Sequence, residues 1–265
     1  MWPVLFSVLM MYLPQRADTV FIEVPAGDYQ VGRKGHHLNP LRTVHLNGYA
    51  ISATELTNRQ FQQFVNATGY VTDAERLQNA MVFEPGLEEF RWKQDSSACW
   101  RYPNGVANGG IENKMNHPVT TVSYTDVQAY CQWANVRLPS FNEWEVAARA
   151  GSATTYFWGE DIEQIVKYAN VWHGHDHLQP DCSDKYMYTS PVGSFEPNVW
   201  GLYDIYGNVF EFCEGHLAAE TAVHARGGSW WCSRYACNYF NSVDIGRVHP
   251  HASFSNQGCR VVKKV

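Results

Sequence analysis

The sequence is most informative at Arg226-Gly227-Gly228-Ser229-Trp230-Trp231-Cys232-Ser233-Arg234-Tyr235-Ala236-Cys237, where two cysteines lie five positions apart behind a glycine turn and two indoles. Two thiols this close along a chain can form a disulfide with each other, or they can bind one metal ion together. Thiolates bind soft ions such as Cu(I) in preference to hard cations. The spacing alone leaves open a small-loop disulfide, two buried thiols in an aromatic core, and a two-thiolate metal site. A redox or soft-metal site is the first hypothesis for this stretch.

The composition indicates a loop-rich, aromatic-packed protein. The chain has 265 residues, of which 45% are hydrophobic and only 17% charged, with 10 Trp, 15 Tyr and 20 Gly. This content is sufficient for a substantial core, and it is unlike that of a helical bundle. The net charge is -6 and no run of basic residues is longer than two, so we expect no nucleic-acid partner.

The chain begins with a short apolar run, Met1 to Leu13, followed by Pro14-Gln15-Arg16-Ala17. The run is too short to span a bilayer and is typical of a secretory signal peptide, with a buried strand as the alternative. We expect residues 1–17 to be such a signal, and the protein to be exported to a periplasm, the medium or a secretory lumen. Residues 18–265 contain no linker, repeat or membrane segment, and they predict a single domain and a monomer.

Regular elements are predicted mainly in the first half. Residues 21–25, 26–32 and 43–46 resemble short strands. Three capping boxes predict helices, each with one apolar face, and the third is expected to stop at Gly151. The boxes are Thr57 with Gln60, Ser123 with Asp126, and Ser140 with Glu143. After Gly151 the chain is predicted to form turns and loops, and long loops in a compact domain are usually functional or held by ions.

Two loops in that second half carry metal-ligand chemistry. Asp204 and Glu211 flank the turn Gly207-Asn208, so that carboxylates and intervening carbonyls can surround one calcium ion; an ordinary solvated turn is the alternative. The loop 173–177 holds three histidines and could bind a borderline metal, although such alternation more often marks a solvated loop. Hydrolase and nucleotide-dependent chemistry are disfavoured because the sequence lacks Gly-x-Ser-x-Gly, His-Glu-x-x-His and glycine-rich phosphate-loop patterns.

From about Phe21 to its end, the chain resembles the formylglycine-generating enzyme (sulfatase-modifying factor) family. The matching segments come in the family's order along the chain. They include Val24-Pro25-Ala26-Gly27, Glu55-Leu56-Thr57-Asn58, Arg137-Leu138-Pro139, Glu143-Trp144-Glu145, Ala169-Asn170-Val171-Trp172, Gly201-Leu202-Tyr203, Gly207-Asn208, Arg226-Gly227-Gly228-Ser229 and Asn256-Gln257-Gly258.

The resemblance implies an α+β, C-type-lectin-like domain with little regular secondary structure. It also implies two structural calcium sites that tie down the loops. One site uses Asn170, the carbonyl of Val171, Asp184 and the carbonyl of Tyr186. The other uses Asp204, the carbonyls of Gly207 and Val209, and Glu211.

For residues 226–237, the resemblance implies a Cu(I) site formed by Cys232 and Cys237, with Ser229 in the same pocket. Family members with both cysteines oxidise a cysteine in a Cys-x-Pro-x-Arg segment of an unfolded sulfatase to Cα-formylglycine with dioxygen. We therefore expect a copper-dependent oxidase with a protein or peptide substrate. The alternative is a non-catalytic, calcium-stabilised binding module of the same fold, with the two cysteines in a disulfide or without copper.

Several residues depart from the family pattern. Val261 stands where the family often has the cysteine that pairs with the one at Cys131, while Cys259 takes the place of a phenylalanine. The disulfide is therefore either shifted or missing. On the substrate side, Ser233 follows the first cysteine, and 243–245 replace an Ala-Ala-Arg stretch. We expect these changes to alter which peptide is accepted.

Overall fold

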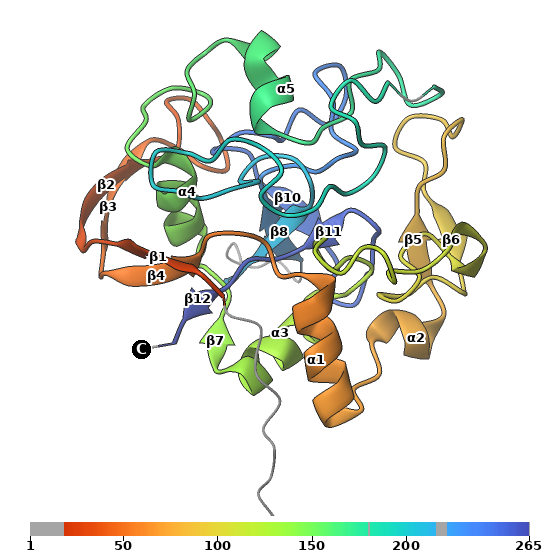
Figure 1. The fold of residues 1–265 in the computed structure, drawn as a ribbon. Helices are drawn as coiled ribbons and strands as arrows, with labels where there is room; N and C mark the ends of the chain where they lie inside the picture. Colours follow the sequence, from red (N-terminus) through yellow and green to blue (C-terminus); the bar gives the residue numbers. More distant parts are fainter. Residues whose placement is uncertain (1–18, 180, 216–221, 265) are drawn as a thin grey trace, which may run out of the picture.

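The described part of the chain folds around two four-stranded sheets and two two-stranded sheets, joined by short helices and long loops (Figure 1). This is a computed structural model that describes residues 19–179, 181–215 and 222–264. The predicted signal peptide, residues 1–17, lies outside the described residues. Within them, no helix combines the length and apolar character needed to cross a membrane.

The first sheet has the strand order β1-β4-β12-β7 and the second has the order β10-β9-β8-β11, while β2 pairs with β3 and β5 with β6. The strands are β1 Phe21–Val24, β2 Gly27–Val31, β3 Arg42–Leu46, β4 Tyr49–Ser52, β5 Ala80–Val82, β6 Lys93–Asp95, β7 Val136–Arg137, β8 Phe210–Cys213, β9 Val223–Arg226, β10 Gly246–Val248, β11 Gln257–Gly258 and β12 Val262–Lys263. The helices are α1 Asn58–Thr68, α2 Asp73–Leu77, α3 Tyr124–Ala134, α4 Phe141–Arg149 and α5 Ile165–Tyr168, with 3-10 turns at Val106–Asn108 and Ile162–Gln164.

The three predicted capping boxes are confirmed at the N-termini of α1, α3 and α4. In each box the cap hydroxyl accepts from the N3 amide while the N3 side chain accepts from the cap amide, so two free amides are satisfied. A fourth box, Thr72 with Glu75, starts the short helix α2, and our sequence analysis missed it. The helix α4 ends at Arg149 with Ala150 left-handed, one residue before the predicted stop.

Replacing Ser140 with alanine is expected to lower the free energy of unfolding by about 1 kcal/mol, because the Glu143 amide loses its acceptor. Urea unfolding of the wild type and the S140A variant measures this difference. The exposed Ser96 serves as a control, since S96A removes the same hydroxyl away from any helix end. Equal losses in both variants would contradict a capping role for Ser140.

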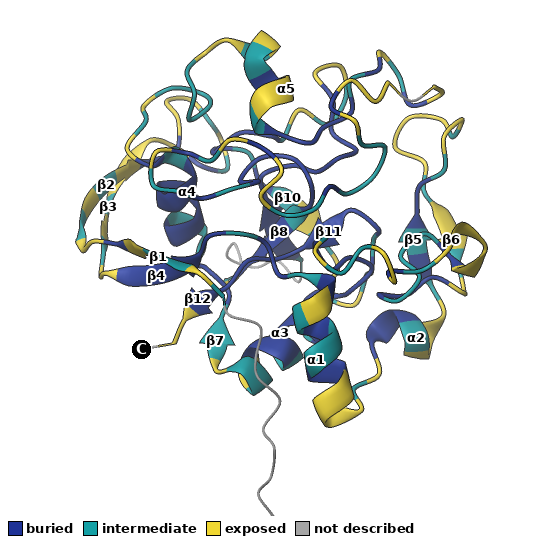
Figure 2. Ribbon diagram, in the orientation of Figure 1, coloured by how far each residue is buried: buried dark blue, intermediate teal, exposed yellow. Residues whose placement is uncertain are grey.

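Strand β12 closes the first sheet near the C-terminus of the chain. It lies between β4 and β7, where Val262 pairs with Ile51 on one side and with Arg137 on the other (Figure 1). Strands β4, β8 and β9 and most of α4 are buried (Figure 2). The last residues of the chain therefore complete the core to which the first strands belong.

The second half of the chain is irregular, as predicted: between α5 and β8 the described residues form only an isolated bridge, between Asn170 and Gly207. This half is nevertheless well buried (Figure 2). Arg226 at the end of β9 anchors it to α4 through an ion pair of 2.9 Å with Glu145, and both side chains are buried. Residues 227–237, which carry the two cysteines, follow directly after Arg226.

Candidate functional site

The glycine pair Gly227-Gly228 makes the turn that carries the thiols. Both residues have positive φ values, 88° and 74°, which favour glycine. A Cβ at Gly227 would lie 2.8 Å from the Ile205 carbonyl oxygen, and one at Gly228 would lie 2.8 Å from the Phe240 amide nitrogen. The backbone can therefore approach its neighbours this closely only because neither residue has a side chain.

The two cysteines converge at the end of this turn. Their Cα atoms are 4.7 Å apart and the sulfurs are joined as a disulfide. A short loop closes the pair, with the Ser233 amide donating to the Ala236 carbonyl at 2.8 Å. Cys237 adopts a left-handed φ of 54°, a conformation that non-glycine residues adopt mainly at functional sites and turns. Reduction of the disulfide would leave two thiols facing one point.

Ser229 lies beside the buried member of the pair. Its hydroxyl oxygen accepts from the Asn256 side-chain amide at 2.9 Å and from the Trp231 amide at 3.4 Å. Both bonds use the oxygen as acceptor, which leaves the hydroxyl hydrogen for the Cys232 sulfur 3.9 Å away. The structure thus places Ser229 with Cys232, as the resemblance implies, with Asn256 as a further member of the group.

A pocket of about 470 Å³ opens next to Cys237. Its wall is mainly aromatic, and the described residues that line it include no carboxylate. The lining residues are Phe90, Trp92, Phe210, Trp231, Cys237, Tyr239, Gly246, Arg247, Val248, His249, Ala252, Phe254, Asn256 and Gln257. Three buried polar atoms of this wall have no hydrogen-bond partner: Trp231 Nε1, Asn256 Oδ1 and Gln257 Oε1. One donor and two acceptors suit the backbone of an extended peptide.

Cys232 and Cys237 have a donor arrangement that fits a Cu(I) ion. Two thiolates from one short loop can ligate a soft ion, and the pocket beside Cys237 leaves room for a further ligand. Trp230 and Trp231 differ in what they line. Both are buried against Phe83 and Trp172, but only Trp231 also lines the pocket.

The first predicted calcium set is brought together around Asp184. This buried carboxylate accepts from the Val171 amide at 3.1 Å and from the Tyr186 amide at 3.0 Å, so three of the four predicted residues are adjacent. The fourth, Asn170, has a buried side-chain oxygen without a hydrogen-bond partner. An unpartnered amide oxygen and a buried carboxylate are ligands that calcium prefers.

The second predicted set contains an ion pair that the sequence analysis missed. Both oxygens of Glu211 accept from Arg260, at 2.6 and 2.7 Å, and Trp144 Nε1 donates to one of them at 2.6 Å. Asp204 is also buried, and its Oδ1 atom has no hydrogen-bond partner. A calcium ion here would share Glu211 with Arg260.

Glu55 joins this group as a third buried carboxylate. It accepts from the Asn208 side chain at 2.6 Å. The cluster of Glu55, Asp204, Glu211 and Arg260, named here the carboxylate cluster, sets three buried carboxyl groups against one guanidinium. Burial, with the charges of Asp204 and Glu211, raises the pKa of Glu55 well above its usual range, and burial raises the pKa of Asp204 to about 6. Ionising all three carboxyl groups would leave a surplus negative charge that a bound cation would offset.

The two calcium sets lie side by side and adjoin the thiol stretch. The Asn208 amide donates to the Asn170 carbonyl at 2.8 Å, and the Asn170 side chain donates to Asn208 Oδ1 at 3.1 Å. The Trp230 amide then donates to the Asn208 carbonyl at 3.0 Å. Gly207 permits this approach, because a Cβ there would lie 2.2 Å from the Asn170 carbonyl oxygen.

The three histidines of loop 173–177 do not converge. His173 lies 3.4 Å from Asp184, His175 packs against Tyr235 at a tilted angle, and His177 is buried under Trp231. Within the described part of the chain, no group of three or more His, Cys, Asp or Glu side chains is placed to hold a metal by itself. The expectation of a solvated loop is wrong for His177, because aromatic residues from distant segments cover it.

The remaining described cysteines are free thiols: Cys99, Cys131, Cys182, Cys213 and Cys259. Cys131 and Cys259 belong to one apolar cluster without a bridge between them. Burial raises the pKa of Cys131 to about 12 and that of Cys259 well above its usual range. Of the two possibilities left by the sequence, the structure therefore has the disulfide missing, not shifted.

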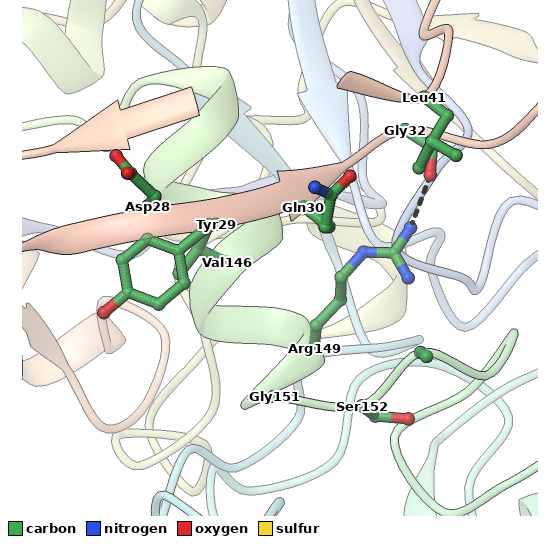
Figure 3. Close-up of a pocket in the computed structure, with 10 residues that line it drawn as sticks. Asp28, Tyr29, Gln30, Gly32, Leu41, Val146, Arg149, Gly151 and Ser152 are labelled. Atoms are coloured by element: carbon green, nitrogen blue, oxygen red, sulfur yellow. Dashed lines mark hydrogen bonds between the residues drawn. The ribbon is translucent and has the colours of Figure 1, made fainter. Parts of the chain in front are cut away.

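A second cavity, of about 550 Å³, lies between β2 and α4 (Figure 3). Arg149 projects into it and donates to the Gly32 carbonyl at 3.1 Å and to Glu145 at 2.9 Å. The described residues that line it include no cysteine or histidine and none of the predicted site residues. Of these two cavities, only the one beside Cys237 is lined by a predicted site residue.

Comparison with known proteins places the chain in a family. Residues 9–265 match the model of the sulfatase-modifying factor enzyme 1-like domain. The chain belongs to this family. It is 33% identical over 279 residues to the formylglycine-generating enzyme of Mus musculus, covering 92% of this chain and 75% of that protein.

Two further relatives bear on fold and activity. The chain is 34% identical over 232 residues to the inactive C-alpha-formylglycine-generating enzyme 2 of Bos taurus, covering 79% of this chain and 75% of that protein. The solved structure of PvdO from Pseudomonas aeruginosa matches it with a TM-score of 0.67 at 25% identity, over 92% of this chain and 94% of that one. The predicted α+β fold of the formylglycine-generating enzyme type is confirmed.

Proposed function

We propose that the protein is a copper-dependent oxidase that converts a cysteine in a Cys-x-Pro-x-Arg segment of a sulfatase-like protein to Cα-formylglycine with dioxygen. Its similarity over 92% of its length to a formylglycine-generating enzyme supports an oxidase-like enzyme at the level of the family. The observation that carries the finer proposal is the convergence of Cys232 and Cys237 beside a peptide-sized aromatic pocket.

Each residue of the site has a separate role in this proposal. Cys232 and Cys237 would hold Cu(I), and the copper, when bound, would supply the activation of dioxygen. Ser229 directs its hydroxyl hydrogen to the Cys232 sulfur and keeps that sulfur oriented. The unpartnered groups of Trp231, Asn256 and Gln257 bind the substrate backbone, while the aromatic wall excludes water.

The reaction balances with one added reductant. The CH2–SH side chain of the substrate cysteine loses its carbon–sulfur bond and becomes an aldehyde, and the sulfur leaves as hydrogen sulfide. Dioxygen accepts four electrons, two of them from the substrate carbon, and the net products beside the aldehyde are hydrogen sulfide and one water. Two electrons and two protons come from an external thiol such as dithiothreitol.

The experiment is incubation of the purified, Cu(I)-loaded protein with a Cys-x-Pro-x-Arg peptide, air and dithiothreitol. We expect an aldehyde, detected by mass spectrometry and by oxime formation, and none from the matched Ser-x-Pro-x-Arg peptide. If copper is demonstrably bound and a range of such peptides gives no aldehyde, the proposed activity is wrong.

A non-catalytic binding module is the second candidate function. The disulfide between Cys232 and Cys237 favours it, as does the similarity to a relative named inactive. It predicts that the protein has five free thiols outside this pair and binds Cu(I) weakly after reduction. Because four of the five are buried, the thiols are counted after unfolding in denaturant without reductant, and a Cu(I) competition titration on the reduced, folded protein then separates the two functions.

We also propose that calcium is a structural ligand of the two sets around Asp184 and Asp204. The unpartnered Asn170 and Asp204 oxygens and the three buried carboxyl groups of the carboxylate cluster support this assignment. Bound calcium would stabilise loops that lack regular hydrogen bonding.

Calcium at about 100 times its Kd is expected to raise the Tm at pH 7.5 by about 5–10 °C, from about 3 kcal/mol of linkage. In the metal-free protein, the pKa of Asp204 is raised from 3.8 to about 6. Its ionisation therefore destabilises the fold as pH rises from about 4 to 6, and the penalty is complete above that range. Calcium relieves this penalty only where Asp204 is ionised.

The Tm shift is therefore expected to shrink at pH 5. Differential scanning fluorimetry with calcium, with magnesium as the control cation, measures the shift at both pH values. A shift that is equal at pH 5 and pH 7.5, or equal with magnesium, would contradict the assignment at Asp204.

We further propose that the protein acts as an exported monomer, as the apolar N-terminal run and the single-domain organisation suggest. N-terminal sequencing of protein recovered outside the cytoplasm is expected to begin near Asp18. Light scattering coupled to size-exclusion chromatography is expected to give the mass of one chain; a dimer mass would contradict the monomer.

A further inference from the structure

His177, from the histidine loop that the proposed function leaves without a role, holds the backbone next to Cys232. Its Nε2 atom lies 2.7 Å from the carbonyl oxygen of Trp231, the peptide group that joins Trp231 to Cys232. The ring stacks on the Trp231 indole with centroids 4.1 Å apart and an interplanar angle of 11°. The contact therefore acts on both the backbone and the side chain of the residue before the thiol.

Both ring nitrogens of His177 face acceptors. Nδ1 lies 2.8 and 2.9 Å from the two carboxylate oxygens of Glu89, and Nε2 faces a carbonyl oxygen. The Trp231 carbonyl only accepts, so Nε2 carries a hydrogen and donates to it, while Nδ1 pairs with the Glu89 carboxyl group. The Glu89 oxygen also accepts from the His177 amide at 3.1 Å, which fixes the orientation of the ring.

The His177 side chain is fully buried, while Glu89 is partly exposed. Aromatic rings surround the histidine: Phe83, Trp172 and Trp231 all lie within 5.5 Å between centroids. A buried imidazole in such surroundings is costly unless both ring nitrogens have hydrogen-bond partners. Loss of either acceptor contact would therefore displace the ring.

The same loop also holds the other side of Cys232. The Trp172 amide donates to the Cys232 carbonyl at 2.9 Å, and the Cys232 amide donates to the Ser229 carbonyl at 2.9 Å. With the His177 contact, the peptide groups before and after the thiol are both fixed. The direction of the Cys232 side chain toward Cys237 depends on these contacts.

We propose that His177, fixed by Glu89, is a positioning residue for the thiol pair: it holds the Trp231 carbonyl and thereby aims the Cys232 sulfur at Cys237. The copper readout of the test rests on the proposed function, whereas the thiol–disulfide readout does not.

The test compares two variants, each of which keeps one of the two His177 contacts, either with the Trp231 carbonyl or with Glu89. His177→Gln retains a donor at the position of Nε2, toward Trp231, and His177→Asn retains one only at the position of Nδ1, toward Glu89. We expect His177→Asn to lower the equilibrium constant for closing the Cys232–Cys237 disulfide against glutathione by about tenfold, the effect of one lost hydrogen bond of about 1.4 kcal/mol. His177→Gln is expected to stay within about twofold of the wild type by the same reasoning.

His45→Asn is the control, because His45 also pairs with a carboxylate but lies exposed on β3. Glu89→Ala, which frees the ring without altering it, should change the disulfide constant in the same direction as His177→Asn. Circular dichroism confirms the fold of each variant, and Cu(I) competition on the reduced proteins should follow the same order. Equal constants for the Asn and Gln variants, or wild-type constants for Asn and Glu89→Ala, would overturn the proposal. If no variant or wild type binds Cu(I), the proposed function fails while the disulfide constants still decide the role of His177.

Discussion

Replacing Arg260 with methionine is expected to lower the free energy of unfolding by about 3–5 kcal/mol, enough to unfold much of the protein at moderate temperature. Arg260 is fully buried, and it donates to Glu211 and to the carbonyls of Ser52, Ala53 and Tyr203. The variant leaves Glu55, Asp204 and Glu211 buried without a cation. Denaturant unfolding in EDTA measures the loss.

Two controls separate charge from packing. Arg91→Met removes an arginine from an exposed pair with Glu88 and should not change stability measurably. The double variant Arg260→Met/Glu211→Gln should recover part of the loss, because one unpaired charge is gone and the Trp144 indole keeps an acceptor. A single variant as stable as the wild type, or a double variant no better than the single one, would contradict an electrostatic role for Arg260.

The elements that the sequence predicted are those determined by neighbouring residues. A capping box needs only two side chains three positions apart, and Ser140 with Glu143 was recognisable for that reason. The Thr72 and Glu75 box carried the same signal and was missed because α2 is only five residues long and has no apolar repeat. The convergence of Cys232 and Cys237 was likewise local, since a five-residue loop cannot separate them far.

The contacts that were not predicted join distant segments. Strand β12 pairs with β4 and β7 across most of the chain, and its two residues have no periodicity from which to predict a partner. Glu55 and Arg260 likewise meet in the carboxylate cluster although they lie far apart in the sequence. The only signal was an arginine inside the apolar stretch Cys259-Arg260-Val261-Val262, which indicates a buried cation that needs carboxylates.

His177 shows how burial changes the interpretation of a motif. Alternating histidines in a loop are typical of a solvated segment, and His175 is exposed as that pattern predicts. His177 is buried because Phe83 and Trp231, from segments on either side in sequence, close over it. The pattern of one loop contains no information about those two residues.

Replacing either Cys232 or Cys237 with serine is expected to weaken Cu(I) binding by about 10²–10⁴-fold, because the second thiolate binds within the same short loop at high effective concentration. Aldehyde formation should fall below detection in both variants. Competition against a Cu(I) chelator of known affinity measures the first effect, and mass spectrometry of the peptide measures the second. The exposed, free Cys182 supplies the control, because Cys182→Ser should change neither.

The same variants distinguish the oxidase from the binding module. If the pair serves only as a cross-link, each variant should lose about 2 kcal/mol of stability relative to the oxidised wild type, the entropy of closing a loop of this length, and Cu(I) affinity should be weak throughout. If the pair is a copper site, reduced wild type and variants should have equal stability without copper, and only the wild type should gain stability when Cu(I) is added. The thiol pair therefore acts as an enzyme site only if its contribution to stability depends on copper and not on the bond between the sulfurs.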